Sequence, residues 1–265
     1  PRARSSPAAI RSISGRSTAS KVAAIYRLCN QYVWQPRPDW GCPMEGRTPD
    51  LLIEAAVESV DAALAAAEGG AHRVELCTDL ARGGTTPDMD LLRTCISHLT
   101  IPVFVLVRPR IGDFVYEPGE HRTMQQQIQA AREAGAHGIV TGALTASKQI
   151  AEDWTAQLIE AARPLPVTFH RAFDACRDLA EALETLVALG VERVLTSGGA
   201  PTAIQGVERI AQLVRQSRGR LAILAGGGIN AGNVVRVRDS GVREVHFSVK
   251  TPEKVRQVIE TLLAR

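Results

Sequence analysis

The sequence predicts a (β/α)8 barrel over residues 49–265, preceded by a basic stretch at residues 1–48. Eight short apolar runs alternate with eight runs of helical periodicity from residue 51 onward. This number of units in about 215 residues is near the lower end for such a barrel. Glycines recur between a helical run and the next apolar run, as helix C-caps do. Seven of the eight apolar runs end in polar residues or glycines, where barrels of this kind place their sites.

The first four units each join a β-like run to an amphipathic run. LLIEAAV (51–57) precedes VDAALAAAEGG (60–70), and HRVELCT (72–78) precedes MDLLRTCISHL (89–99). IPVFVLVRPR (101–110) precedes GEHRTMQQQIQAAREAGA (119–136), and GIVTGAL (138–144) precedes AEDWTAQLIEAAR (151–163). Between the second strand and its helix lies a long loop rich in Gly and Thr (79–90), which we expect to fold over the mouth of the barrel.

The last four units repeat this pattern. LPVTFHRAFD (165–174) precedes DLAEALETLVALG (178–190), and VERVLTSGG (191–199) precedes AIQGVERIAQLVRQ (203–216). RLAILAGGG (220–228) precedes NAGNVVRVRDSG (230–241), and VREVHFS (242–248) precedes TPEKVRQVIETLLA (251–264). A doubly wound open sheet is the alternative, but it requires a Gly-rich turn after the first strand. Here the first strand ends in Ala-Val-Glu-Ser.

Composition restricts the function classes. Residues 1–48 hold eight Lys or Arg and two Asp or Glu, so the net charge of +3 arises in this stretch and the remainder is slightly acidic. We therefore do not expect nucleic-acid binding. No apolar run approaches the roughly 20 residues that span a bilayer. Residues 1–48 resemble a transit peptide in composition. We favour a disordered basic extension together with a wrongly assigned start, for which Met44 would be the natural first residue.

The five cysteines are odd in number and form no CxxC pair. A disulfide framework and a zinc ribbon are therefore unsupported, and free thiols in a reducing compartment are expected.

The fifth strand carries three ionisable residues at its carboxyl end, His170, Arg171 and Asp174. If its pleat continues to Asp174, His170 and Asp174 share one face and Arg171 takes the other. Glu54 and Glu75 lie on the first two strands, and Arg108 on the third is the expected counter-charge. These six residues are candidates for acid–base chemistry and for binding charge. The alternatives are a structural ion cluster and a core histidine paired with an aspartate.

Glycines after the sixth and seventh strands predict an anion site. They let backbone amides approach a ligand closely, and barrels commonly bind phosphate near the last two strands. The alternative is that they only form tight turns. The candidate residues are Ser197, Gly198, Gly199, Gly227, Gly228 and, after the eighth strand, Ser248.

Five stretches, in this order, resemble the CutC family of copper homeostasis proteins: RVELCTDLARGGTTP (73–87), IPVFVLVRPRIGDFVY (101–116), RPLPVTFHRAFD (163–174), ERVLTSGGAP (192–201) and GGGIN (226–230). The resemblance covers the chain from about Leu51 onward. It implies a cytoplasmic TIM barrel that handles copper and associates with copies of itself.

Two departures from the family pattern bear on function. The family's copper-binding members place cysteines on the first two strands; Cys77 matches the second, but Ala56 stands at the first. Because Cu(I) prefers soft sulfur ligands, Cys77 needs a partner, for which Cys176 and, more weakly, His246 or His170 are candidates. The connector after the eighth strand is also short, which predicts an open mouth. We therefore expect copper homeostasis through copper binding as the function, with an enzyme acting on a small anionic or phosphorylated substrate as the alternative.

Overall fold

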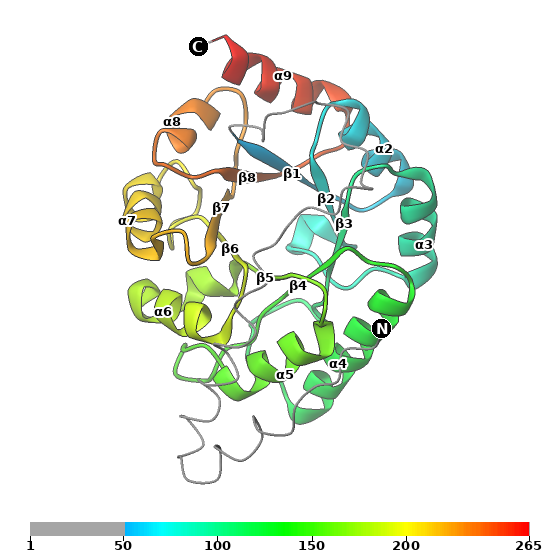
Figure 1. Ribbon diagram of the computed structural model, residues 1–265, viewed down its shortest axis with the longest axis vertical. Coiled ribbons are helices and arrows are strands. Elements are labelled where there is room, and N and C mark those ends of the chain that lie inside the picture. The colour runs from blue at the N-terminus through cyan, green and yellow to red at the C-terminus, as the bar shows by residue number, and fades with distance from the viewer. Residues whose placement is uncertain (1–50, 265) are drawn as a thin grey trace, which may run out of the picture. The chain divides into compact units, whose positions relative to one another are not determined.

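The computed structural model describes residues 51–264, so the expectations for residues 1–48 lie outside the described residues. Eight parallel strands form a closed barrel in the order β1-β2-β3-β4-β5-β6-β7-β8, and helices surround it (Figure 1). The predicted (β/α)8 barrel is confirmed. The strands are β1 (Leu52–Val57), β2 (Arg73–Leu76), β3 (Val103–Leu106), β4 (Gly138–Thr141), β5 (Val167–Phe169), β6 (Arg193–Thr196), β7 (Ala222–Gly226) and β8 (Glu244–Ser248).

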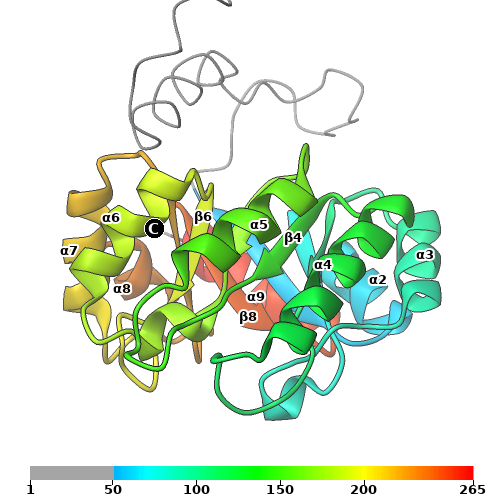
Figure 2. The ribbon, with the colours of Figure 1, turned by 90° about the horizontal axis from the view of Figure 1, so that it is seen from below.

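A helix follows each strand on the outside of the barrel; α4, α5 and α6 lie in front of the strands in Figure 2. The helices are α2 (Val60–Glu68), α3 (Met89–His98), α4 (Pro118–Glu133), α5 (Glu152–Ala162), α6 (Leu179–Leu189), α7 (Val207–Ser217), α8 (Val234–Arg238) and α9 (Pro252–Leu263). None of the described helices is long and apolar enough to cross a membrane.

Local signals explain where α6 begins and ends. Asp178 caps its amino end, because its carboxylate accepts hydrogen bonds from Ala180 N and Glu181 N, two of the amide groups that a helix leaves unpaired there. Gly190 ends the helix with φ 78°, a left-handed conformation that costs glycine little. The chain then turns directly toward β6.

The prediction for residues 165–174 needs correction. The strand ends at Phe169, and residues Arg171–Ala175 form a 3-10 helix. His170 starts this turn, since its Nδ1 accepts a hydrogen bond from Ala172 N at 3.2 Å and its carbonyl oxygen accepts one from Phe173 N. Local hydrogen bonding thus replaces the pleat, and His170 and Asp174 do not alternate along one strand face.

The strand register arranges the inward-facing side chains in layers, each contributed by alternate strands, because the eight strands are staggered. Pairings such as Glu54 with His246, Ala56 with Glu75 and Thr168 with Arg193 define the stagger. From the amino-terminal end toward the mouth, the layers are Arg73, Gly138, Arg193 and Glu244; Glu54, Phe104, Thr168 and Leu224; Glu75, Val140, Leu195 and His246; and Ala56, Leu106 and Gly226, at a level where β5 has already ended.

Two apolar regions result. A large cluster fills the region between the strands and the helices and includes Ile53, Leu92, Ile128 and Leu158. A small cluster of Cys77, Phe104, Leu106 and Val140 lies inside the barrel. Part of the barrel interior is therefore apolar, whereas β1, β2, β6 and β8 contribute charged side chains to it.

Candidate functional site

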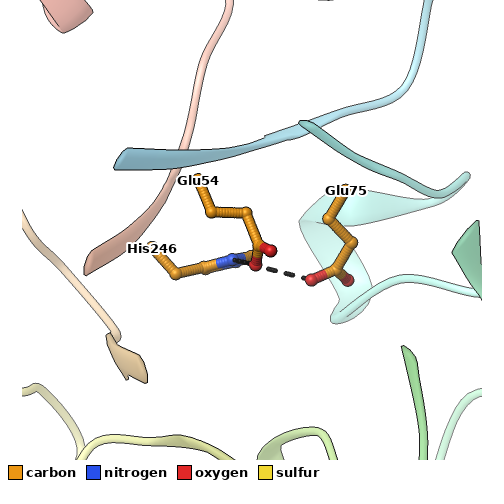
Figure 3. Close-up of side chains that lie close together, drawn as sticks. All are labelled: Glu54, Glu75 and His246. Atoms are coloured by element: carbon orange, nitrogen blue, oxygen red, sulfur yellow. Dashed lines mark hydrogen bonds and ion pairs between the residues drawn. The ribbon is translucent and has the colours of Figure 1, made fainter. Parts of the chain in front are cut away.

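Three side chains from neighbouring strands converge inside the barrel (Figure 3). Glu54 comes from β1, Glu75 from β2 and His246 from β8, and one ligand-type atom of each lies within 4.8 Å of the others. His246 Nδ1 lies 2.8 Å from Glu54 Oε1 and 3.6 Å from Glu75 Oε2. The Glu54 side chain is fully buried, whereas His246 keeps 14% of its side chain exposed. Two carboxylates and an imidazole thus share one largely buried site.

A charged layer lies directly beneath these residues. Arg73 forms an ion pair with Glu54 through its Nε and reaches Glu244 through Nη2 at 2.8 Å. Arg193 Nε contacts Glu244 at 2.6 Å, and the guanidinium groups of Arg73 and Arg193 lie 4.8 and 5.5 Å from the centre of the Phe104 ring. The counter-charge of Glu54 is therefore Arg73, and not Arg108 as the sequence suggested. A buried carboxylate requires such a partner.

The pKa values of the two carboxyl groups are driven apart. Burial disfavours the charged form of Glu54, but Arg73, the hydrogen bond with His246 and Arg193 lower its pKa to about 2. Burial raises the pKa of Glu75 to about 7, with a further contribution from the charge of Glu54. Burial alone disfavours protonated His246, but the hydrogen bond to Glu54 and the charge of Glu75 raise its pKa. Glu54 is thus charged at neutral pH, whereas the raised pKa of Glu75 favours its protonated form.

Arg108 holds the loops that surround the mouth of the barrel. Its guanidinium donates hydrogen bonds to the carbonyl oxygens of Gly83, Gly84 and Gly112 at 2.7–3.0 Å. It also lies 4.8 Å from the centre of the Phe114 ring. The arginine therefore joins the loop after β2 to the loop after β3, which indicates a structural role.

Asp174 occupies much of the predicted anion site. Its carboxylate accepts hydrogen bonds from Ser197 N at 3.0 Å and Gly199 N at 2.9 Å, and from the hydroxyl of Thr196. It also forms an ion pair with Arg171. The anion that the amides of Ser197 and Gly199 bind is thus the Asp174 carboxylate.

Tight turns account for part of the remaining glycine pattern. Gly198 has φ 73°, and a Cβ there would lie 2.5 Å from the carbonyl oxygen of Gly206. The carbonyl oxygen of Gly228 accepts hydrogen bonds from Asn230 and Asn233. Gly227 differs, because a Cβ there would lie 2.9 Å from Arg171 Nη1, so this backbone lies beside a cation.

The other predicted residues lie apart from the carboxylates and His246. Ser248 is exposed at the end of β8, and its carbonyl oxygen accepts a hydrogen bond from Lys254 Nζ at 2.6 Å. Cys77 is buried, with Sγ 3.6 Å from the carbonyl oxygen of Val57. Cys176 follows the 3-10 helix, and burial raises the pKa of its thiol to about 12. Among the described residues, the cluster of metal-ligating atoms contains neither thiol.

Sequence reasoning missed three residues that shape the site: Arg73, Arg193 and Glu244. Arg73 stands two positions before Glu75, and Glu244 two before His246. Because strand side chains alternate, this spacing places each on the inward face of its strand. Strand parity, applied to residues before the candidates as well as after them, would have found Arg73 and Glu244.

Comparisons with known proteins agree on one family. The model of the CutC family matches residues 51–251. The copper homeostasis protein cutC homolog of Homo sapiens is 45% identical over 207 residues, which cover 78% of this chain and 76% of that protein. A family protein CutC from Mesorhizobium japonicum is 46% identical over 211 residues, covering 79% of this chain and 82% of the relative.

Solved structures show the same fold. The crystal structure of CutC from Streptococcus agalactiae superposes with a TM-score of 0.71 and 34% identity, and the match covers 74% of this chain and 97% of that one. A structure described as an aldolase gives a TM-score of 0.62 at 14% identity and covers 84% of this chain and 98% of the other. The latter likeness shows the barrel alone.

Proposed function

Because the chain belongs to the CutC family of copper homeostasis proteins, we propose that it acts by binding a copper ion inside the barrel, at Glu54, Glu75 and His246. The observation that carries the proposal is the convergence of their ligand-type atoms within 4.8 Å. Imidazole and carboxylate together suit a divalent ion, and Cu(II) has the highest affinity of the first-row divalent metals for a given set of such ligands. Copper is the cargo of this protein and not a cofactor.

The thiols give less support to a Cu(I) site. Cys77 is fully buried, burial raises the pKa of its thiol, and Glu75 opposes its ionisation further. Copper binds the thiolate form, and Cu(I) prefers several sulfur ligands. Ala56 supplies none on the neighbouring strand. The nitrogen and oxygen ligands are therefore the better candidates.

Titration of the purified protein with Cu(II) tests this proposal. We expect one ion per chain, and an electron paramagnetic resonance spectrum with coupling to a single imidazole nitrogen. Glu75→Gln and His246→Gln should each weaken binding at least tenfold. Glu58→Gln is the matched control, since Glu58 is exposed just after β1, and Cys77→Ala should also bind normally. Loss of copper in Cys77→Ala together with full binding in Glu75→Gln would refute the site.

Affinity should also depend on pH. A metal ion competes with protons for its ligands, and the pKa of Glu75 is about 7. Cu(II) binding should therefore strengthen as the pH rises through 7, and calorimetric titrations at pH 6 and pH 8 would measure the difference.

Catalysis on a small anionic or phosphorylated molecule is a second candidate function. A carboxyl group with a pKa of about 7 beside one with a pKa of about 2 is an arrangement suited to general acid–base chemistry. Arg171 beside Gly227 would bind the anion. A panel of phosphorylated metabolites should then contain compounds that raise the melting temperature, with a smaller rise in Arg171→Gln. A panel without any thermal shift would count against this function.

We further propose a cytoplasmic location and self-association. The described cysteines, Cys77, Cys95 and Cys176, are free thiols, which is typical of a reducing compartment. Localisation of a tagged full-length chain and light scattering of the purified protein would test these two expectations.

A further inference from the structure

Two histidines fasten the amino ends of neighbouring strands. His72 Nδ1 accepts a hydrogen bond from Ile53 N at 3.0 Å, and the amide of His72 donates one to the carbonyl oxygen of Ile53 at 2.9 Å. The same pair of bonds joins His137 to Val103, at 3.0 and 2.9 Å. Each histidine stands immediately before an even-numbered strand and holds a residue of the preceding strand through both its ring and its backbone. We call this arrangement a histidine latch.

A third latch at the equivalent position uses a carboxylate. Glu192 immediately precedes β6, and its Oε2 accepts a hydrogen bond from Val167 N of β5 at 2.8 Å. A carboxyl group keeps acceptor capacity whether it is ionised or protonated, whereas an imidazole nitrogen that carries a proton cannot accept. The amino end of the barrel thus has two latches that require a neutral ring and one latch that does not.

Both histidine latches require the tautomer with its proton on Nε2. A backbone amide donates to Nδ1 in each case, so Nδ1 must be unprotonated. The side chains of His72 and His137 are half-buried, and burial lowers the pKa of each ring from its ordinary value of 6.5. An imidazolium would place a second donor opposite the backbone amide, so a latch cannot close around it.

The charges next to His72 oppose its protonation or are bound elsewhere. Arg73 follows it on β2, and its positive charge lowers the pKa of His72 further. On β1, the carboxylate of Glu54 is paired with the same Arg73. On α2, which packs against β2, Glu68 is paired with Arg256. Strand β3 contains no charged residue.

The surroundings of His137 are less charged. Strands β3 and β5, on either side of β4, contain no charged residue. Arg132 and Glu133 lie at the end of α4 and bind a carbonyl oxygen near the end of α5 and a glutamine of α4. Glu160 of α5 is paired with Arg163. Since β3 and β4 contribute no residue to the proposed copper site, this latch is independent of copper.

We propose that the two histidine latches form an acid-sensitive conformational device, which releases the amino ends of β1 and β3 when the rings gain a proton and leaves β5 and β6 joined by Glu192. The closed latch holds a neutral ring, and the open latch lets the ring titrate near 6.5. Closure is therefore favoured above pH 6.5 and lost as the pH falls below it. This inference goes beyond copper binding and does not depend on it.

The size of the effect follows from the open state. If the closed ring takes up no proton, protonation of the open ring multiplies the open population by about 1.1 at pH 7.5 and by about 11 at pH 5.5. Each histidine latch should thus open about tenfold more often at the lower pH.

Amide hydrogen exchange of the metal-free full chain, followed by NMR, tests the proposal. The protection factors of the Ile53 and Val103 amides should fall about tenfold between pH 7.5 and 5.5, whereas that of Val167 should change less than about twofold. Nitrogen-15 NMR at pH 7.5 should show the proton of His72 and His137 on Nε2. A proton on Nδ1, constant protection of Ile53 and Val103, or an equal fall at all three amides, which indicates global unfolding, would overturn the inference.

Asparagine substitutions separate the charge from the hydrogen bond. The amide oxygen of asparagine accepts a hydrogen bond much as Nδ1 does, and it does not titrate. His72→Asn should abolish the acid loss of protection at Ile53 only, and His137→Asn that at Val103 only. His98→Asn is the matched control, because His98 is exposed on α3, and it should leave both losses in place. Variants with unchanged melting temperatures at pH 7.5 that still lose protection in acid would contradict the assignment, and the wild-type exchange data decide the question if a variant does not fold.

Discussion

Replacing Glu75 by glutamine should stabilise the protein at pH 8 and leave its stability nearly unchanged at pH 4. Folding raises the pKa of this carboxyl group from 4.5 to about 7, so the folded chain holds the proton more tightly than the unfolded chain does. Stability is therefore lost as the pH rises from about 4.5 through about 7. Glutamine resembles the protonated form in shape and charge, and it avoids this loss.

The magnitude follows from the shift. About 2.5 pKa units correspond to about 3 kcal/mol at 1.36 kcal/mol per unit, and the Glu75 side chain is only 7% exposed, so solvent screening is slight. The pKa of about 7 already includes the opposing attraction to His246, and glutamine reproduces the contacts of the protonated carboxyl group only in part. Glu75→Gln is therefore expected to gain about 1–3 kcal/mol at pH 8.

Urea unfolding at pH 4, 6 and 8 measures the effect. Glu54→Gln provides the contrast, because folding lowers the pKa of Glu54 to about 2. The stability from Glu54 is present above pH 4.5 and is lost as the pH falls toward 2, so Glu54→Gln should be destabilised by about 3 kcal/mol at pH 7. Glu58→Gln serves as the exposed control. A Glu75→Gln variant no more stable than wild type at pH 8, with an unchanged m-value, would refute the reasoning.

Three further predictions concern the surroundings of the site. Arg73→Met leaves buried Glu54 without its guanidinium partner, so it should lower the free energy of unfolding by about 3–5 kcal/mol at pH 7. Urea titration measures this loss, and a loss below about 1 kcal/mol would be inconsistent with the ion pair. Asp174→Ala leaves the amides of Ser197 and Gly199 without their acceptor, so it should lower the free energy of unfolding by about 1–3 kcal/mol. Calorimetry would detect this as a fall of at least about 2 °C in the melting temperature, and an unchanged melting temperature would contradict the prediction. Cys77 should resist alkylation by iodoacetamide in the folded protein and react in urea, because its thiol is buried and its pKa is raised; mass spectrometry of the labelled peptide would show the opposite if the thiol were reactive.

The barrel was predictable because local patterns repeat along the chain. Each strand lies within its predicted range, since apolar runs and glycine-ended helices carry the signal in neighbouring residues. The end of β5 was not predictable in the same way. His170 begins a turn here, and Ala172 N donates a hydrogen bond to the His170 ring. A local hydrogen bond of this kind does not change the pattern of apolar residues, so the pattern could not predict it.

The candidate site was predictable in part. The inward-facing carboxylates and His246 follow from strand parity, and closure of the barrel brings their strands together. Their partners depend on register, which joins residues as distant in sequence as Arg73 and Glu244. A sequence analysed one strand at a time cannot assign such pairs. For this reason Arg108, and not Arg73, was predicted as the counter-charge of Glu54.

The charged layer of Arg73, Arg193 and Glu244 has a consequence for how a ligand enters and leaves the barrel. Its side chains are joined by ion pairs, and Phe104, in the next layer toward the mouth, packs against both guanidinium groups, so charged groups occupy the amino-terminal end of the barrel interior. A copper ion bound at the proposed site, on the mouth side of this layer, is therefore expected to enter and leave through the mouth.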